Sequence, residues 1–217
     1  MKRRRLAALG LLPLLPRLVK AAEGDTLFSA AAPGAMPKGW AKVPINDSKT
    51  PTDYALVRDG DLTVLRGQAK SAASMFMHEG GVDLSKTPIV RWRWKVGKMP
   101  SGADNSVASK EDSAARLVFT FEGDRSTLPF LERTKMSVAD SLSGQELPYA
   151  TLMYVTSSVA APGQRIVNPH TRRIQMYVAG KAEDALGRWV TLERDVEADL
   201  RAAFGEAPKK MLAYGVM

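Results

Sequence analysis

Apolar and polar residues alternate with period two along most of the chain, and this pattern predicts β-strands. The clearest stretch is VRWRWKV, residues 90–96, where valines and tryptophans share one parity and arginines and lysine share the other. Similar patterns predict nine strands, at residues 53–59, 61–67, 71–78, 88–96, 114–122, 150–158, 172–180, 188–194 and 209–217. Residues 26–30 and 40–45 are candidate edge strands. Asp59-Gly60, between the first two runs, predicts a hairpin.

Two segments have helical spacing instead. The first is residues 128–144, where Gly144 is placed to end the helix. Its predicted buried face consists of Leu128, Leu131, Val138 and Leu142. The second is residues 194–206, with Asp195 as the N-terminal cap and Gly205 at the end. Its predicted buried stripe consists of Val196, Leu200 and Phe204. Many strands with two interposed short helices predict a mainly β protein, an antiparallel β-sandwich.

The charge of the chain is concentrated at its N-terminus. In total, 31 Lys and Arg stand against 23 Asp and Glu, a formal net charge of +8. Four basic residues at 2–5 precede an apolar run at 6–15 and small residues near Ala21 and Ala22, which is typical of an export signal and too short for a membrane span. Removing residues 1–22 takes away six of the 31 basic residues and no acidic ones, which leaves a net charge of about +2.

These features predict an export signal at 1–22 and a single β-sandwich domain at 23–217. The protein is then expected in the periplasm or outside the cell, by the general secretory or the twin-arginine route. No stable membrane span is expected. A net charge near +2 also disfavours nucleic-acid binding, which needs a strong basic footprint.

Catalytic and metal-binding motifs are scarce in the sequence. The chain has no cysteine, which excludes thiolate nucleophiles and Cys-ligated zinc. Its two histidines, His78 and His170, do not have zinc-site spacing. No nucleophile elbow, phosphate loop or dinucleotide fingerprint is present, so we expect no metal and no cofactor. A Ser-His-Asp arrangement assembled in space stays open.

Several motifs resemble one bacterial family. They are WRWKV, EDSAARLVFTFEGDRS, SGQELPYATLMYV, IVNPHTRRIQMYV, LGRWVTLERDVEADLRAAFGEAP and YGVM, in this order over about residues 40–217. Together they resemble the family known as domain of unknown function 3047. The resemblance implies an exported, mostly β domain, with a jelly roll similar to carbohydrate-binding and galactose-binding-like modules as the expected fold. In that family the strand matching MLAYGVM continues into a polar stretch, so the chain is a candidate truncated member.

Strand parity suggests a first candidate site. In residues 114–122 the apolar parity predicts a core face, which leaves Arg116 and Thr120 on the opposite face. If this strand shares a sheet with residues 88–96, several cations gather on one outer face, with Asp112 orienting Arg116. The residues proposed for this face are Arg91, Arg93, Lys95 and Arg116, with Gln175 and Tyr177 as additions. Such a face suits a carboxylated or sulfated sugar, although the arginines could simply solvate the sheet.

The loop RIVNPHTRR is the second candidate site. Asn168, His170 and Thr171 gather hydrogen-bonding groups around Pro169, which is typical of a turn. The alternative is a capped turn without a ligand.

The sequence therefore favours a non-catalytic envelope binding domain for a glycan or similar polar ligand. The alternative is an envelope hydrolase or lyase that uses His170, Arg116 and Asp112. The oligomeric state is not predicted by any of these features.

Overall fold

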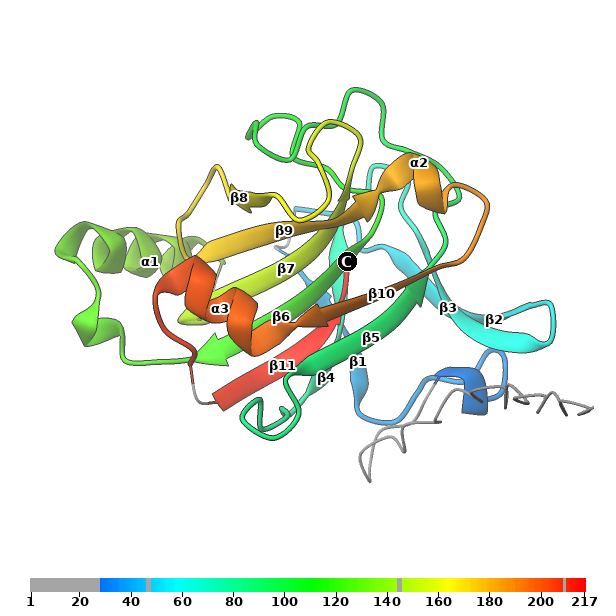
Figure 1. Cartoon of the computed structure of the whole chain (residues 1–217), viewed down its shortest axis with the longest axis horizontal. Coiled ribbons are helices and arrows are strands. Elements are labelled where there is room, and N and C mark those ends of the chain that lie inside the picture. The colour runs from blue at the N-terminus through cyan, green and yellow to red at the C-terminus, as the bar shows by residue number, and fades with distance from the viewer. Residues whose placement is uncertain (1–27, 46–47, 144–145, 209) are drawn as a thin grey trace, which may run out of the picture.

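The computed structural model describes residues 28–45, 48–143, 146–208 and 210–217. Its strands are β1 (Trp40–Pro44), β2 (Asp53–Asp59), β3 (Leu62–Gln68), β4 (Ser74–Glu79), β5 (Ile89–Trp94), β6 (Arg116–Glu122), β7 (Ala150–Ser157), β8 (Arg165–Val167), β9 (Ile174–Lys181), β10 (Val190–Asp195) and β11 (Lys210–Val216). Its helices are α1 (Phe130–Ser143), α2 (Ala182–Ala185) and α3 (Val196–Phe204), with 3-10 turns η1 (Phe28–Ala30) and η2 (Arg125–Thr127). The protein is mainly β (Figure 1).

The nine predicted strands are all confirmed, and the edge candidate at 40–45 contains β1. The other edge candidate is wrong where it is described, because residues 28–30 form η1. The Asp59-Gly60 hairpin is confirmed, since β2 pairs with β3 in antiparallel register and Gly60 takes the positive φ of 62° that this tight turn requires. The short elements β8 and α2 were not predicted.

Seven strands form the main sheet, in the order β1-β4-β11-β6-β7-β9-β8. The remaining four strands make two separate two-stranded ribbons, β10-β5 and β2-β3. Pairing is antiparallel except between β7 and β9, which run parallel. The prediction of an antiparallel sandwich is therefore wrong at this pair, whose two strands are joined by a connection that contains β8.

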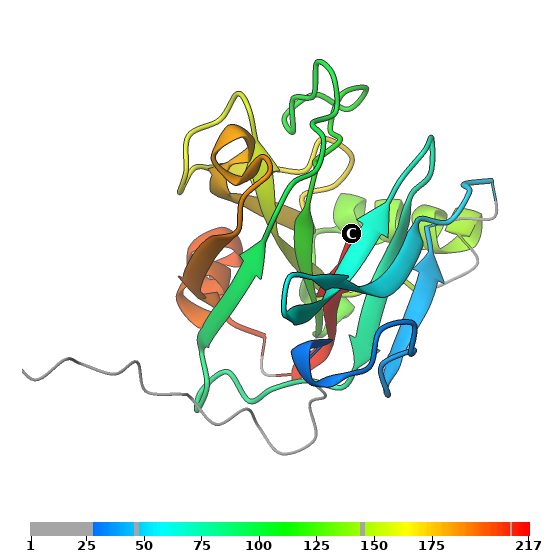
Figure 2. The same ribbon diagram turned by 90° about the vertical axis from the view of Figure 1, so that its right-hand side faces the viewer.

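Both ribbons cover the same face of the main sheet, which we call the ribbon-side face. Trp92 of β5 stacks on Tyr154 with ring centroids 5.3 Å apart, and Tyr54 of β2 stacks on Phe76 of β4 at 5.3 Å. Figures 1 and 2 show β5, β10 and α3 on one part of this face and the β2-β3 hairpin on another. The result is a sandwich-like arrangement. The predicted burial of Trp94 is confirmed, at 8% exposure, whereas Trp92 packs against the core but is only partly buried.

The opposite face of the main sheet is buried as well. Val118 and Met176 on this face are fully buried, and Arg116 is only 7% exposed. Residues 97–115 of the connection between β5 and β6, here called the 97–115 loop, reach this side, because the backbone carbonyl of Glu111 accepts a hydrogen bond from the Arg116 side chain. The prediction that Arg116 and Thr120 lie on a solvent-facing surface is therefore wrong.

Helix α3 follows its prediction closely. The Asp195 carboxylate accepts a hydrogen bond from the Ala198 amide at 2.9 Å, and Gly205 ends the helix with a φ of 78°. Val196 and Leu200 are buried against the ribbon-side face, and Phe204 is partly buried there.

Helix α1 exists, but its predicted buried face is wrong. Leu128 is buried just before the helix begins, whereas Leu131 and Val138 are exposed. The buried apolar residue of the helix is Met136, at 3% exposure. The side chain of Leu142 and the predicted cap Gly144 lie outside the described residues.

The predicted export signal also lies outside the described residues, which begin at 28. None of the helices in the described ranges is both long and apolar enough to cross a membrane.

Candidate functional site

The outer surface of the β10-β5 ribbon carries the cations predicted from the VRWRWKV pattern. Arg91, Arg93 and Lys95 are exposed, as expected for the parity opposite the tryptophans. Across the ribbon, Thr191 pairs with Arg93 and Glu193 pairs with Arg91. Three cations and two neighbouring side chains form the surface that we call the cationic ribbon face: Arg91, Arg93, Lys95, Thr191 and Trp189, which precedes β10.

Trp189 is the centre of this surface. The Arg93 guanidinium and the Lys95 ammonium each lie 5.4 Å from the centroid of its ring system. Its indole Nε1 donates a 2.6 Å hydrogen bond to Asp59, at the turn of the β2-β3 hairpin. Cation–π contacts of this kind hold a partly exposed ring in a fixed orientation.

Asp59 joins the two ribbons at this surface. Its carboxylate pairs with Lys95 and accepts from Trp189, and these two hydrogen bonds, Lys95 first, hold its pKa below the usual value. Arg91 likewise pairs with Glu193. Within the described parts of the chain, Arg93 forms no ion pair with a carboxylate. Arg93 is thus the cation of the ribbon face that can accept an anionic ligand without breaking an existing pair.

The loop candidate forms a second polar cluster around Glu111. One carboxylate oxygen of Glu111 accepts a 2.8 Å bond from the Asn168 amide, and the other lies 3.1 Å from Nε2 of His170. The Asn168 side-chain oxygen in turn accepts from the backbone amide of His170 at 2.9 Å. We call Glu111, Asn168 and His170 the loop cluster; it ties the 97–115 loop to the β8-β9 loop.

Arg116 lies beneath this cluster. Its Nη2 donates a 2.8 Å bond to the backbone carbonyl of Glu111. Burial lowers the pKa of the Arg116 guanidinium, and the charges of Glu111 and Asp112 act in the opposite direction. The predicted hydrogen bond from Arg116 to the Asp112 carboxylate is not formed. The Arg116 guanidinium donates to the backbone carbonyl of Glu111 instead.

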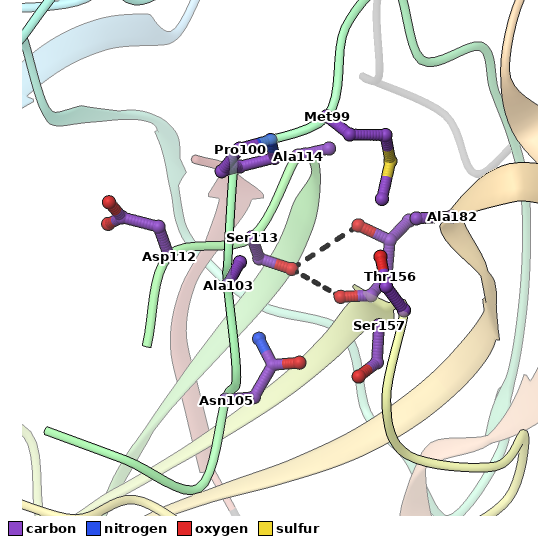
Figure 3. A pocket seen from close by; sticks show the side chains of 11 residues that line it. Met99, Pro100, Ala103, Asn105, Asp112, Ser113, Ala114, Thr156, Ser157 and Ala182 are labelled. Atoms are coloured by element: carbon purple, nitrogen blue, oxygen red, sulfur yellow. Dashed lines mark hydrogen bonds between the residues drawn. The ribbon is translucent and has the colours of Figure 1, made fainter. Parts of the chain in front are cut away.

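A small cavity lies between the 97–115 loop and the end of β7. Figure 3 shows Ser113 directed at Thr156, to whose backbone carbonyl it donates at 2.6 Å, while the Asp112 carboxylate points away from the cavity. The buried Asn105 also lines the cavity and approaches the Glu111 carbonyl at 3.4 Å. The cavity holds about 10 Å³, enough for one water molecule and too little for a sugar.

Tyr177, predicted for the outer surface, is buried on the ribbon-side face at 6% exposure. Its hydroxyl donates to the backbone carbonyl of Asp199 in α3 at 3.3 Å. Parity fails for Tyr177 for the same reason as for Arg116, because both faces of the main sheet are covered.

The structure thus divides the predicted site into three places. Arg91 and Arg93 lie on the cationic ribbon face, and Tyr177 lies under α3. Asn168 and His170 meet through Glu111, with Arg116 beneath them. The prediction that Arg91, Arg93 and Arg116 share one sheet face is wrong, because β5 belongs to a ribbon and β6 to the main sheet.

Two residues of these surfaces were not selected from the sequence. Trp189 had a signal, since it alternates with apolar residues in RWVTLER and so faces outward with the cations of β5. Glu111 had no such signal, because nothing in the sequence indicates its contact with Asn168, which is 57 residues away. Among the described residues, no three His, Cys, Asp or Glu side chains are grouped so that they could hold a metal ion.

These features define a mainly β, sandwich-like protein with a cationic ribbon face and a separate polar loop cluster. A family model described as protein of unknown function (DUF3047) matches residues 38–217. The chain therefore belongs to this family, as its motifs suggested. Neither a search of curated proteins nor a search of solved structures gave a match.

Proposed function

We propose that this protein is an exported, non-catalytic binding domain for a polar, anionic, carbohydrate-like ligand, and that the cationic ribbon face is its binding surface. The observation that carries this proposal is the exposed Arg93 guanidinium, which has no carboxylate partner among the described residues and lies 5.4 Å from the Trp189 ring. A guanidinium binds planar carboxylates and sulfates through two parallel hydrogen bonds.

The surroundings of Arg93 support this role. Asp59 engages Lys95 and the indole nitrogen of Trp189, which fixes both side chains beside Arg93. The hydroxyl of Thr191, directly across the ribbon from Arg93, adds a neutral hydrogen-bonding group suited to a sugar hydroxyl. The ligand is thus expected to place its acidic group on Arg93. The finer fold assignment, a jelly-roll-like or galactose-binding-like sandwich, stays a prediction alongside this proposal.

Binding of labelled acidic oligosaccharides tests the proposal. Fluorescent galacturonate and sulfated oligosaccharides, with neutral galactose oligomers for comparison, are titrated with the purified protein. Replacing Arg93→Gln is expected to weaken binding at least tenfold, since a charge-assisted pair contributes about 1.5–3 kcal/mol. Arg201→Gln is the matched control, because Arg201 is also exposed but pairs with Glu197 on α3.

The control variant should bind within about twofold of the wild type. Acidic oligosaccharides that bind equally well to the Arg93→Gln variant would exclude the ribbon face as the site. Failure of all these ligands to bind the wild type would refute the proposed ligand class.

Export is a separate part of the proposal. It rests on the basic, apolar and small-residue segments of residues 1–22. N-terminal sequencing of the protein recovered from the periplasmic fraction is expected to begin near Glu23. Recovery of the intact N-terminus from the cytoplasm would contradict export.

The loop cluster favours a second candidate function, an envelope hydrolase or lyase. The favouring observation is the 3.1 Å contact between His170 and Glu111, because a carboxylate-held imidazole can transfer protons, and the His170 side chain is 58% exposed. A panel of ester, glycoside and uronate substrates tests it. Turnover that is lost in both His170→Gln and Glu111→Gln would support the second function, and the absence of turnover of every substrate would exclude it for these classes.

A further inference from the structure

Helix α1 presents an apolar strip to solvent. Phe130, Leu131 and Val138 are 70%, 71% and 54% exposed, respectively. Leu131 and Val138 lie on one line of the helix, two turns apart, and Phe130 lies about 80–100° to one side of them, so all three are on the side of the helix away from Met136. The other large exposed apolar residues of the described chain occur singly in separate elements or loops. A cluster of three on one helix indicates a contact surface.

The charges of α1 are divided between its two sides. Glu132 and Asp140 lie on the same line as the buried Met136, and Asp140 pairs with Arg125 at 2.6 Å. Arg133 and Lys135 are exposed. Lys135 follows Leu131 by one turn and Arg133 follows Phe130 by three residues, so the two cations flank the apolar strip on opposite sides.

We propose that α1 binds the surface of an anionic lipid bilayer, with Phe130, Leu131 and Val138 inserted and Arg133 and Lys135 at the lipid headgroups. An interfacial helix needs apolar residues on one side with cations beside them, which α1 has. The long side chains of Arg133 and Lys135 can extend to phosphates while their stems pack on acyl chains.

Charge complementarity favours lipid over another protein as the partner. Both carboxylates of the described part of α1 lie on its inner line, so the outward side combines apolar and basic side chains. Figure 1 shows α1 at one edge of the molecule, away from the β2-β3 hairpin, so a bilayer can approach it without obstruction by that hairpin. The interaction is independent of the ligand proposed for the cationic ribbon face.

Vesicle flotation tests this proposal. Purified wild-type protein is mixed with phosphatidylcholine vesicles that contain about one third phosphatidylglycerol, and in parallel with pure phosphatidylcholine vesicles. We expect flotation with the anionic vesicles, and release as salt screens the headgroup contacts. Phe130→Ser combined with Leu131→Ser should lower the apparent partition coefficient at least about tenfold, because two inserted side chains are lost.

Two further variants make the outcome specific. Arg133→Gln combined with Lys135→Gln should weaken flotation with anionic vesicles about three- to tenfold. The matched control is Val159→Ser, since Val159 is 67% exposed but lies in a loop, and it should bind as the wild type does.

The proposal is overturned if wild-type protein does not float, or if the Phe130→Ser, Leu131→Ser variant floats unchanged. Sedimentation equilibrium provides the remaining test. Self-association of the wild type without vesicle binding, abolished by the same double variant, would identify the strip as a contact between two copies and would also overturn the lipid proposal.

Discussion

The network that holds α3 and β10 against the main sheet gives a quantitative prediction. The Asp199 carboxylate accepts a 2.7 Å hydrogen bond from Tyr154 and two from Arg194, at 2.9 and 2.5 Å. Tyr154 is fully buried and Asp199 is 8% exposed. These bonds position β10, and with β10 the ribbon that carries Arg93, so the network supports the proposed binding surface.

Replacing Asp199→Ala leaves both partners without an acceptor. The stranded Tyr154 hydroxyl, which water cannot reach, costs about 1–3 kcal/mol. Arg194 keeps a side-chain exposure of 30% and can rehydrate, so its loss is discounted to about 1 kcal/mol. The expected destabilisation is therefore about 3 kcal/mol, or roughly 6–12 °C in the melting temperature. Tyr154→Phe, which retains the Arg194 pair, should cost only about 1 kcal/mol.

Urea unfolding followed by tryptophan fluorescence measures these values at neutral pH. In the double variant the two costs should not add, because Asp199→Ala no longer strands a hydroxyl, and the coupling should be about 1–2 kcal/mol. The matched control is Glu197→Ala, which removes an exposed pair with Arg201 on the same helix and should change stability by less than about 1 kcal/mol. Additive costs, or an Asp199→Ala variant as stable as the control, would refute this account of the network.

Three shorter predictions concern the rest of the fold. Gly215→Ala should lower the free energy of unfolding by about 2–3 kcal/mol, because the added Cβ would lie 2.6 Å from the Met77 sulfur and also crowd a backbone carbonyl of β4. Thermal unfolding measures this, and an unchanged melting temperature would contradict it. Burial raises the pKa of Tyr54 to about 12, so the neutral phenol stabilises the fold fully below the unfolded pKa of about 10, and this contribution is lost as the pH rises through 12. Between about pH 10 and 12, the urea midpoint should therefore fall less for Tyr54→Phe than for the wild type. The hydrogen bond from Arg125 lowers the pKa of Asp140, so the ionised carboxylate stabilises the fold above the unfolded pKa of about 3.9, and this stabilisation is lost as the pH falls through the lowered value. In acid unfolding, the stability of Asp140→Asn should therefore depend less on pH in this range than that of the wild type.

Local patterns predicted most of the elements because the information that specifies them is local. The strands β2 and β3 alternate and are joined by Asp59-Gly60, and α3 carries its own cap at Asp195 and its own terminating Gly205. The ribbon strand β5 has one face against the sheet and one in solvent, so its period of two gave the correct exposure of Arg93.

For the strands of the main sheet, alternation did not predict which residues are exposed, because both faces of the sheet are buried and neither is an outer face. At the start of β6 the second face meets the 97–115 loop, and Arg116 is buried there with a backbone carbonyl as its partner. Helix α1 failed for a related reason. Its apolar periodicity predicted a core face that includes Leu131, whereas Met136 is buried and Leu131 is exposed to solvent.

The different surroundings of Arg93 and Arg116 separate ligand binding from loop anchoring. Arg93 is exposed, and its contact with Trp189 lies on the ribbon, so its replacement should affect a ligand without affecting the 97–115 loop. Arg116 is buried and bonded to that loop, so its replacement should loosen the loop whether or not a ligand exists. A double variant of the two arginines would confound these effects. Arg93 alone, compared with a paired surface arginine, therefore gives the cleaner measure of binding at the ribbon face.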